Sequence, residues 1–226
     1  MDKHTEGRNM FIGHYGPAFG AKSIFRRVPL WVYFLAVQWL DVVWSLLVLG
    51  GVEHLEIKPG YMQASSLVLY DMPYTHGLAG AAILSVLLGA IVALFIPGQR
   101  WAAFGWVALA AFSHWLLDLV VHAPDLWVYD NVKVGLGLWR WLWISLPLEL
   151  ILMVGGAWLY RRNVPARTPR GDVWLWLFVA VMAGLELYNT FGPQPASPAM
   201  AAQMALLGYG VLMVLAGLVD MTRTKA

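Results

Sequence analysis

The sequence predicts an all-α integral membrane protein, a polytopic bundle of six or seven transmembrane helices. Apolar residues make up 60% of its 226 residues, and its mean hydropathy is +0.63. Asp, Glu, Lys and Arg together make up only 12%, about half of the roughly 25% that is usual in soluble domains. A soluble fold needs more polar surface than this. A soluble enzyme, a nucleic-acid-binding protein and a disordered chain are therefore excluded.

Long apolar runs follow one another along the chain, and a spanning helix needs about 20 such residues. We expect spans at 29–50, 76–96, 101–122, 139–160, 173–191 and 200–220. An earlier apolar run, 10–25, is shorter and contains Gly13, Gly16 and Gly20. This run is an interfacial helix, a re-entrant segment or a short first span whose glycines permit close packing.

The basic residues orient these spans, because Lys and Arg concentrate in cytoplasmic loops. Arginines lie in the loops 97–100 and 161–172, and the C-terminal tail is also basic. The alternate loops between spans carry only Lys58 and Lys133. We therefore expect a cytoplasmic C-terminus.

Cysteine is absent from the chain. This excludes disulfides, thiolate metal sites and cysteine nucleophiles. Any transition metal must be held by histidines and carboxylates, which suits zinc, manganese or iron.

Ionisable side chains inside the spans are costly unless they are paired, hydrated or bound to metal. The candidates are His14, Asp41, His76, His114, Asp118, His122, Glu149 and Glu186. In the segment 112–122, F-S-H-W-L-L-D-L-V-V-H, two His and one Asp are spaced i, i+4 and i+8 along one helical face. Such a pair can bind one metal ion from successive turns, as in the H-E-x-x-H helix. The alternative is a His–Asp hydrogen bond between packed helices.

The expected depths of these side chains favour one site. In the orientation above, Asp41, His76 and the segment 112–122 lie in the middle or outer part of the membrane, as does Glu149. His14 joins them only if 10–25 crosses the bilayer from outside to inside. We therefore favour seven helices, a short first span and an external N-terminus. Glu186 is equally well explained as part of a structural hydrogen-bond cluster.

Four short motifs resemble the YdjM-like family. They are F-I-G-H-Y, Q-W-L-D, P-Y-T-H-G-L and S-H-W-L-L-D. The family comprises bacterial inner-membrane proteins described as metal-dependent hydrolases and is distantly similar to zinc-dependent phospholipases C. The resemblance covers residues 10–150. It implies that the metal ligands are His14, Asp41, His76, His114 and Asp118, with His122 and Glu149 as further members. The chain departs from the family at Gly77, where a Ser is usual, so a polar partner of the preceding His is expected to be missing.

These observations predict one membrane domain over 1–226, with a metal-site core at 10–150 and two additional C-terminal helices at 173–220. A site of His and carboxylates suits one or more zinc ions, which lower the pKa of bound water to about 7 and polarise a phosphoryl oxygen. We expect a hydrolase that acts on a lipid-like phosphoester from the outer half of the bilayer. Asp118 and Glu149 are its expected catalytic carboxylates, with Glu149 as general base or bridging ligand.

Two other functions fit the same residues. One is a transporter or proton- or metal-coupled permease, because intramembrane acids and histidines often mark ion pathways. The other is an inactive metal-binding scaffold. Membrane lipid is the expected partner, and whether the chain forms a homo-oligomer stays open.

Overall fold

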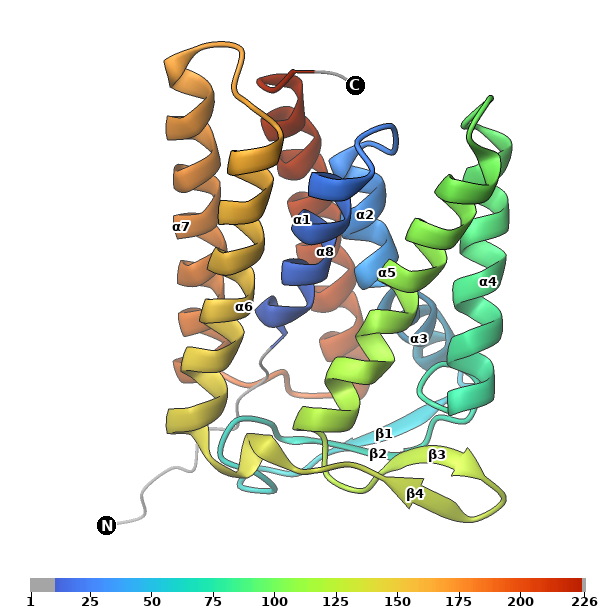
Figure 1. Cartoon of the computed structure of the whole chain (residues 1–226). Coiled ribbons are helices and arrows are strands. Elements are labelled where there is room, and N and C mark those ends of the chain that lie inside the picture. Colours follow the sequence, from blue (N-terminus) through green and yellow to red (C-terminus); the bar gives the residue numbers. More distant parts are fainter. Residues whose placement is uncertain (1–10, 225–226) are drawn as a thin grey trace.

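The computed structural model describes residues 11–224 of the chain as a bundle of helices (Figure 1). A 3-10 turn, η1 (Ile12–His14), leads into the first helix, and a second one, η2 (Leu138–Arg140), precedes the sixth. The eight α-helices in this range are α1 (Tyr15–Ile24), α2 (Leu30–Val37), α3 (Trp39–Leu49), α4 (Leu78–Leu94), α5 (Arg100–Val121), α6 (Leu142–Asn163), α7 (Pro169–Phe191) and α8 (Pro198–Met221). The predicted external position of the N-terminus concerns residues outside the described range.

Two small β-hairpins lie together at one end of the bundle (Figure 1). Strand β1 (His54–Ile57) pairs antiparallel with β2 (Leu67–Asp71), and β3 (Leu126–Tyr129) pairs antiparallel with β4 (Val132–Val134). The all-α prediction is therefore corrected to a mostly helical fold. Aromatic and β-branched residues, as in L-W-V-Y at β3, favour strands even within short connections.

Four helices, α5 to α8, are long and apolar enough to cross a membrane. The pair α2 and α3 makes a fifth if it is counted as one span, although the two helices meet at an angle of 54°. The run expected at 76–96 forms α4, which has 17 residues. The run at 10–25 forms only α1, whose 10 residues extend about 15 Å. By length and composition the structure thus supplies four or five of the six or seven expected spans.

The apolar run 29–50 is a broken helix. The break lies at Gln38, whose φ of −110° and ψ of 9° are not helical. The backbone N–H of Gln38 donates to Leu35 O in a tight four-residue turn. Because α3 leaves this turn in a new direction, the carbonyl of Val37 and the side chain of Asp41 face the interior of the bundle.

The short helix α1 packs closely against α6. A Cβ on Gly16 would lie 2.6 Å from Leu152 O, and a Cβ on Gly156 would lie 2.5 Å from Gly16 O. A Cβ on Gly13 would lie 3.1 Å from the Glu149 backbone. The predicted role of the glycines in close packing is confirmed for Gly13 and Gly16. It is wrong for Gly20, which has no neighbour within 4 Å of its Cβ position.

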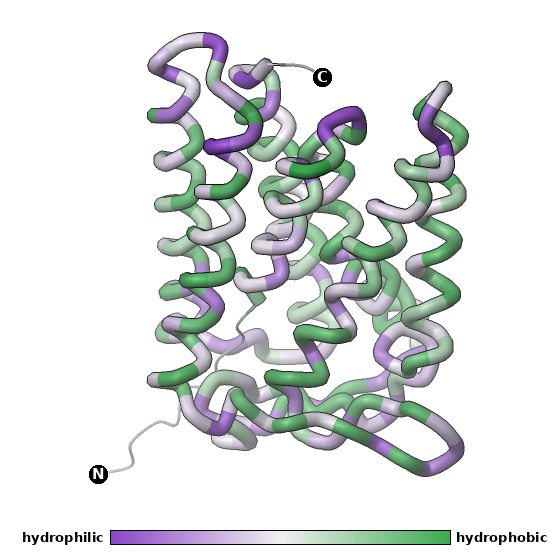
Figure 2. Tube along the Cα trace, in the orientation of Figure 1, coloured by the Kyte–Doolittle hydropathy of each residue, from purple (hydrophilic) through white to green (hydrophobic). Residues whose placement is uncertain are grey.

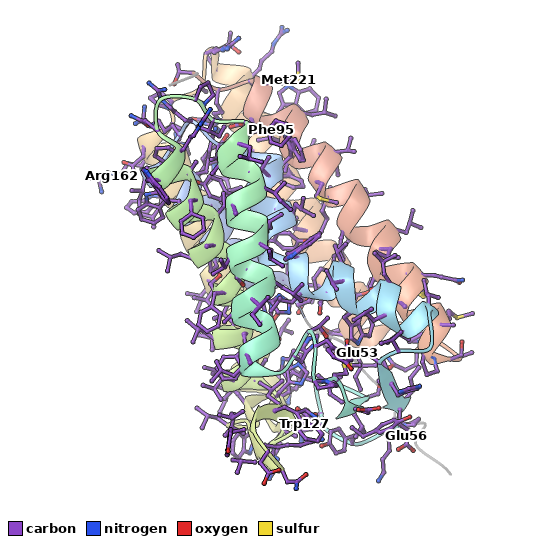
Figure 3. All side chains as sticks on the ribbon, turned by 90° about the vertical axis from the view of Figure 1, so that its right-hand side faces the viewer. Glu53, Glu56, Phe95, Trp127, Arg162 and Met221 are labelled. Atoms are coloured by element: carbon purple, nitrogen blue, oxygen red, sulfur yellow. The ribbon has the colours of Figure 1, made fainter. Side chains whose placement is uncertain are left out.

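The two ends of the bundle differ in composition. The end that carries the hairpins, here called the hairpin end, includes Glu53, Glu56 and Trp127, whereas Arg162 lies at the opposite end, here called the arginine end (Figure 3). Hydrophilic residues gather in the connections at both ends, and the helices between them are mostly hydrophobic (Figure 2).

Candidate metal centre

Six of the seven side chains predicted to form a metal site meet at one place in the bundle. They come from η1 (His14), α3 (Asp41), the connection two residues before α4 (His76), α5 (His114 and Asp118) and the C-cap of α5 (His122). All except Asp41 are buried, with 2–4% of their surface exposed. This set of six residues is called the His/Asp cluster below.

Asp118 lies at the centre of the His/Asp cluster, and its two oxygens face different histidines. Its Oδ1 lies 3.1 Å from Nε2 of His14 and 3.6 Å from Nε2 of His122. Its Oδ2 lies 3.1 Å from Nε2 of His114 and 3.7 Å from Nε2 of His76. The predicted i, i+4, i+8 face of this helix is therefore confirmed.

Asp41 lies on the same side of the cluster as Oδ2 of Asp118. Its Oδ1 lies 3.3 Å from Nε2 of His76 and 3.4 Å from Nε2 of His114. Its Oδ2 accepts a hydrogen bond from the Tyr209 hydroxyl at 2.6 Å. Two groups have ligand atoms close enough together to hold a metal ion, and they share His114: His14, His114 and Asp118, and Asp41, His76 and His114.

The outer nitrogen of each of two histidines contacts a backbone carbonyl. Nδ1 of His14 lies 3.0 Å from Phe11 O, and Nδ1 of His114 lies 2.7 Å from Val37 O. A carbonyl oxygen can only accept, so both Nδ1 atoms carry a proton and donate it. The Nε2 atoms of the neutral rings are then unprotonated and point into the cluster.

His76 is oriented in the same way by a chain of side chains. Nδ1 of His76 lies 2.8 Å from Oγ1 of Thr75, which donates its own proton to Glu53 Oε2 at 2.6 Å. Since the hydroxyl proton of Thr75 is used, its oxygen accepts the Nδ1 proton of His76. Metal-binding histidines commonly donate their second N–H to a carbonyl or carboxylate in this way.

The resulting arrangement could hold a cation. Unprotonated Nε2 atoms and carboxylate oxygens are both hydrogen-bond acceptors, yet they face one another across 3.1–3.7 Å. Oδ2 of Asp118 makes no hydrogen bond with any described residue, although it is buried. A buried carboxylate oxygen without a donor is costly. A metal ion, or extra protons on the histidines, would remove the conflict.

His122 lies at the edge of the cluster. Its Nδ1 is 3.4 Å from Asp125 Oδ1, and its ring lies 4.5 Å from that of Trp139. The indole Nε1 of Trp139 donates to Glu149 Oε1 at 3.0 Å.

Glu149, the seventh predicted ligand, lies behind the His/Asp cluster and binds the segment that carries His14. Its Oε2 accepts from the backbone N–H of Gly13 at 3.3 Å. Glu186 acts beside it, accepting from the backbone N–H of Phe11 at 3.4 Å. Both carboxylates thus hold the residues before α1, whose N–H groups have no partner within the helix. Glu149 does not belong to either group that can hold a metal ion.

Sequence reasoning missed several neighbours of the cluster and misjudged one departure from the motif pattern. The partner of His76, expected to be missing because Gly77 follows it, is Thr75, which precedes it. A side chain at Gly77 would place its Cβ 2.3 Å from Pro73 O, so a larger residue does not fit there. Thr75 stands within P-Y-T-H and could have been found from this spacing. Glu53 lies in a connection, and nothing in its surrounding sequence marks it.

A cavity of about 400 Å³ opens from the His/Asp cluster. All six residues of the cluster line it, so a ligand in the cavity can reach them. The other walls are mostly apolar and come from α3, β2, the end of α7, the α7–α8 connection and α8.

Comparison of the chain with protein-family models, curated proteins and solved structures found no match. The resemblance to the YdjM-like family therefore rests on the four short motifs alone.

Proposed function

We propose that this protein is a membrane-embedded, metal-dependent hydrolase that acts on a lipid-like phosphoester. The observation that carries the proposal is the orientation of His14, His76 and His114, whose outer nitrogens are bound and whose Nε2 atoms converge on two carboxylates. This is the donor set and the preorganisation that a divalent metal requires. Zinc is the first candidate because all ligands are nitrogen and oxygen, and manganese and iron are the alternatives.

The residues of the cluster divide the work of such a site. Asp118 would offer both oxygens as ligands and Asp41 would offer Oδ1, while Oδ2 of Asp41 accepts from the Tyr209 hydroxyl. A zinc ion held there would lower the pKa of a bound water to about 7 and polarise a phosphoryl oxygen. Glu149 holds Gly13 and Trp139, which position His14 and His122. The general-base role of Glu149 stays a prediction.

The proposal also includes the orientation of the protein in a bacterial inner membrane. Counting α2 with α3 as one span and α4 as another gives six crossings, and α1 adds a short seventh. The arginine end is then cytoplasmic, and the hairpin end, with the metal centre, faces outward. The charge distribution of the loops supports this orientation, and the resemblance to the YdjM-like family supports the choice of membrane.

The packing toward the arginine end argues against a transporter. The ring of Phe19 contacts those of Phe34, Tyr160 and Phe178 there, and Phe34 also contacts Phe178, with centroids 5.1–6.5 Å apart. All four belong to one buried apolar cluster. An ion or proton pathway across the membrane needs polar or hydrated groups along its whole length. The layer formed by these four rings interrupts such a path between the His/Asp cluster and the Lys22–Asp220 ion pair near the arginine end.

Metal content and turnover together test the proposal. We would purify the protein in detergent, measure bound metals by mass spectrometry, and assay phospholipids and polyprenyl phosphates with and without chelator. The expected result is stoichiometric metal and a hydrolysis that stops when the metal is removed and returns when zinc is restored. Turnover that ignores the chelator, or metal-free protein from chelator-free preparations, would contradict the proposal.

A further inference from the structure

The cavity above the His/Asp cluster extends sideways between α7 and α8. Its α8 wall includes Ala201, Ala205, Gly208 and Leu212, which follow one another every three or four residues. This spacing places them on one face of the helix. Three of the four are small, so they leave room along α8 instead of filling it.

The cavity opens along α7 and α8, so its opening faces whatever medium surrounds these two helices. Both helices are candidate membrane spans. Side chains at the α8 rim of the cavity are apolar and exposed, with 71% of Leu207 and 46% of Val211 accessible, whereas the polar lining residues Asn189 and Gln194 lie near the α7–α8 connection. A water-soluble molecule does not approach through such a rim, because exposed apolar surface on a spanning helix contacts hydrocarbon.

The inner walls continue this apolar character up to the cluster. Trp44 of α3 and Leu69 of β2 line the cavity and are buried, with 5% and 2% of their surface exposed. None of the described residues that line it is Lys or Arg. Positive charge for an anionic group must therefore come from the His/Asp cluster, as a bound metal ion or as protonated histidines, and the rest of the cavity suits hydrocarbon.

We propose that the cavity binds one hydrocarbon chain of a membrane lipid, which enters sideways between α7 and α8 and brings its polar linkage to the His/Asp cluster. The assignment of the linkage to the cluster rests on the proposed function, whereas the binding of the chain rests on the cavity alone. The lipid-facing opening would let the enzyme take its substrate from the bilayer without extracting it into water.

Gly208 offers a direct way to close the passage. Nothing lies within 4 Å of the position that its Cβ would occupy, so a phenylalanine fits there and extends into the cavity. Gly210, two residues further on, also has no neighbour within 4 Å but does not line the cavity. Gly208→Phe and Gly210→Phe are therefore matched variants, and only the first should block the chain.

The probe is a phosphatidylglycerol with a diazirine in one acyl chain, reconstituted with the protein in vesicles, photolysed and mapped by peptide mass spectrometry. We expect wild type and Gly210→Phe to be labelled at Trp44 or Leu69, which bulk lipid cannot reach, and this labelling to fall to background in Gly208→Phe. Metal content is measured on the same samples and should be equal in all three proteins. Thermal unfolding checks that both variants fold.

The outcomes separate this inference from the proposed function. Wild-type protein without labelling at these buried residues, or undiminished labelling in Gly208→Phe, would overturn the inference even if metal is bound. Labelling that is lost only in Gly208→Phe supports it, and it does so even if the protein proves to hold no metal, in which case only the hydrolase proposal fails.

Discussion

Replacing Asp118 by asparagine should strongly weaken metal binding without unfolding the protein. Its carboxylate faces the Nε2 atoms of four histidines at 3.1–3.7 Å. Asparagine has nearly the same shape, but it removes the charge and turns an NH₂ group toward unprotonated imidazole nitrogens. Because those nitrogens can accept from an amide, the metal-free variant should be at least as stable as metal-free wild type, while its affinity for metal falls.

The size of the effect follows from linkage. Zinc at about 100 times its Kd stabilises the wild-type protein by about 2.7 kcal/mol. A chain of this size gains about 2–4 °C in Tm per kcal/mol, so we expect a rise of about 5–11 °C. Outer partners of metal ligands alone contribute about 10–100-fold in affinity, so loss of the central ligand should cost at least about 100-fold. At the same zinc concentration the variant then gains about 0.4 kcal/mol, or about 1–2 °C.

The assay is thermal unfolding of detergent-purified protein, stripped with chelator and measured with and without zinc, together with metal content. Asp71→Asn is the matched control, because Asp71 Oδ2 lies 3.1 Å from Nδ1 of His54 in an exposed pair on the β1–β2 hairpin. The control should retain the full zinc-dependent rise. If Asp118→Asn keeps the metal content and the rise of the wild type, or Asp71→Asn loses both, the assignment of the His/Asp cluster is wrong.

Three further predictions concern the surroundings of the site and its orientation. Thr75→Val should weaken zinc binding about 10–100-fold by removing the acceptor of the His76 Nδ1 proton, whereas Thr75→Ser should bind zinc as the wild type does. Equal zinc affinities of Thr75→Val and wild type in a chelator-competition titration would show that this contact is not needed. Glu149→Gln should keep most of the metal, since its one side-chain oxygen still accepts from Gly13 or Trp139, whereas Glu149→Ala removes both acceptors and should lose more. Full metal content in Glu149→Ala would contradict the positioning role. The chain has no cysteine of its own, so single cysteines can report topology. A cysteine introduced at Arg167 should be labelled only from the cytoplasmic side, and one introduced at Asp130 only from outside. The reverse pattern would contradict the proposed topology.

The sequence predicted the His/Asp cluster better than it predicted the helices that position it. The spacing of His114 and Asp118 on one helical face needs only the period of the α-helix. Asp41 and His76 were assigned to the same site from their estimated depth in the membrane. Such an estimate is reliable when the ends of the spans are clear. The break at Gln38 was missed because a single polar residue, without Pro or Gly beside it, does not interrupt the apolar pattern of the run 29–50.

The outer partners of the cluster could not be predicted for a different reason. Ionisable residues are informative where they stand in an apolar span, and Glu53 stands in a connection that we expect to be solvated. The structure buries Glu53, with 1% of its surface exposed, beneath the hairpins. The hairpins themselves are only 3–5 residues per strand, which is too short for periodicity to separate them from loops.

The helix termini near the His/Asp cluster have a common physical explanation. Backbone carbonyls inside a continuous helix accept from their own helix and are surrounded by its turns, so they rarely accept from a side chain of another segment. Phe11 O lies at the N-cap, where it accepts the His14 N–H at 3.3 Å and keeps a lone pair for the His14 ring, and Val37 O is available because α2 stops there. Ending a helix among apolar neighbours normally leaves costly unpaired groups. Here His14 and His114 pair with these two carbonyls, and the same contacts fix their Nε2 atoms toward the metal centre. The short α1 and the break between α2 and α3 are therefore part of the site, and a continuous helix through 29–50 would remove the acceptor that orients His114.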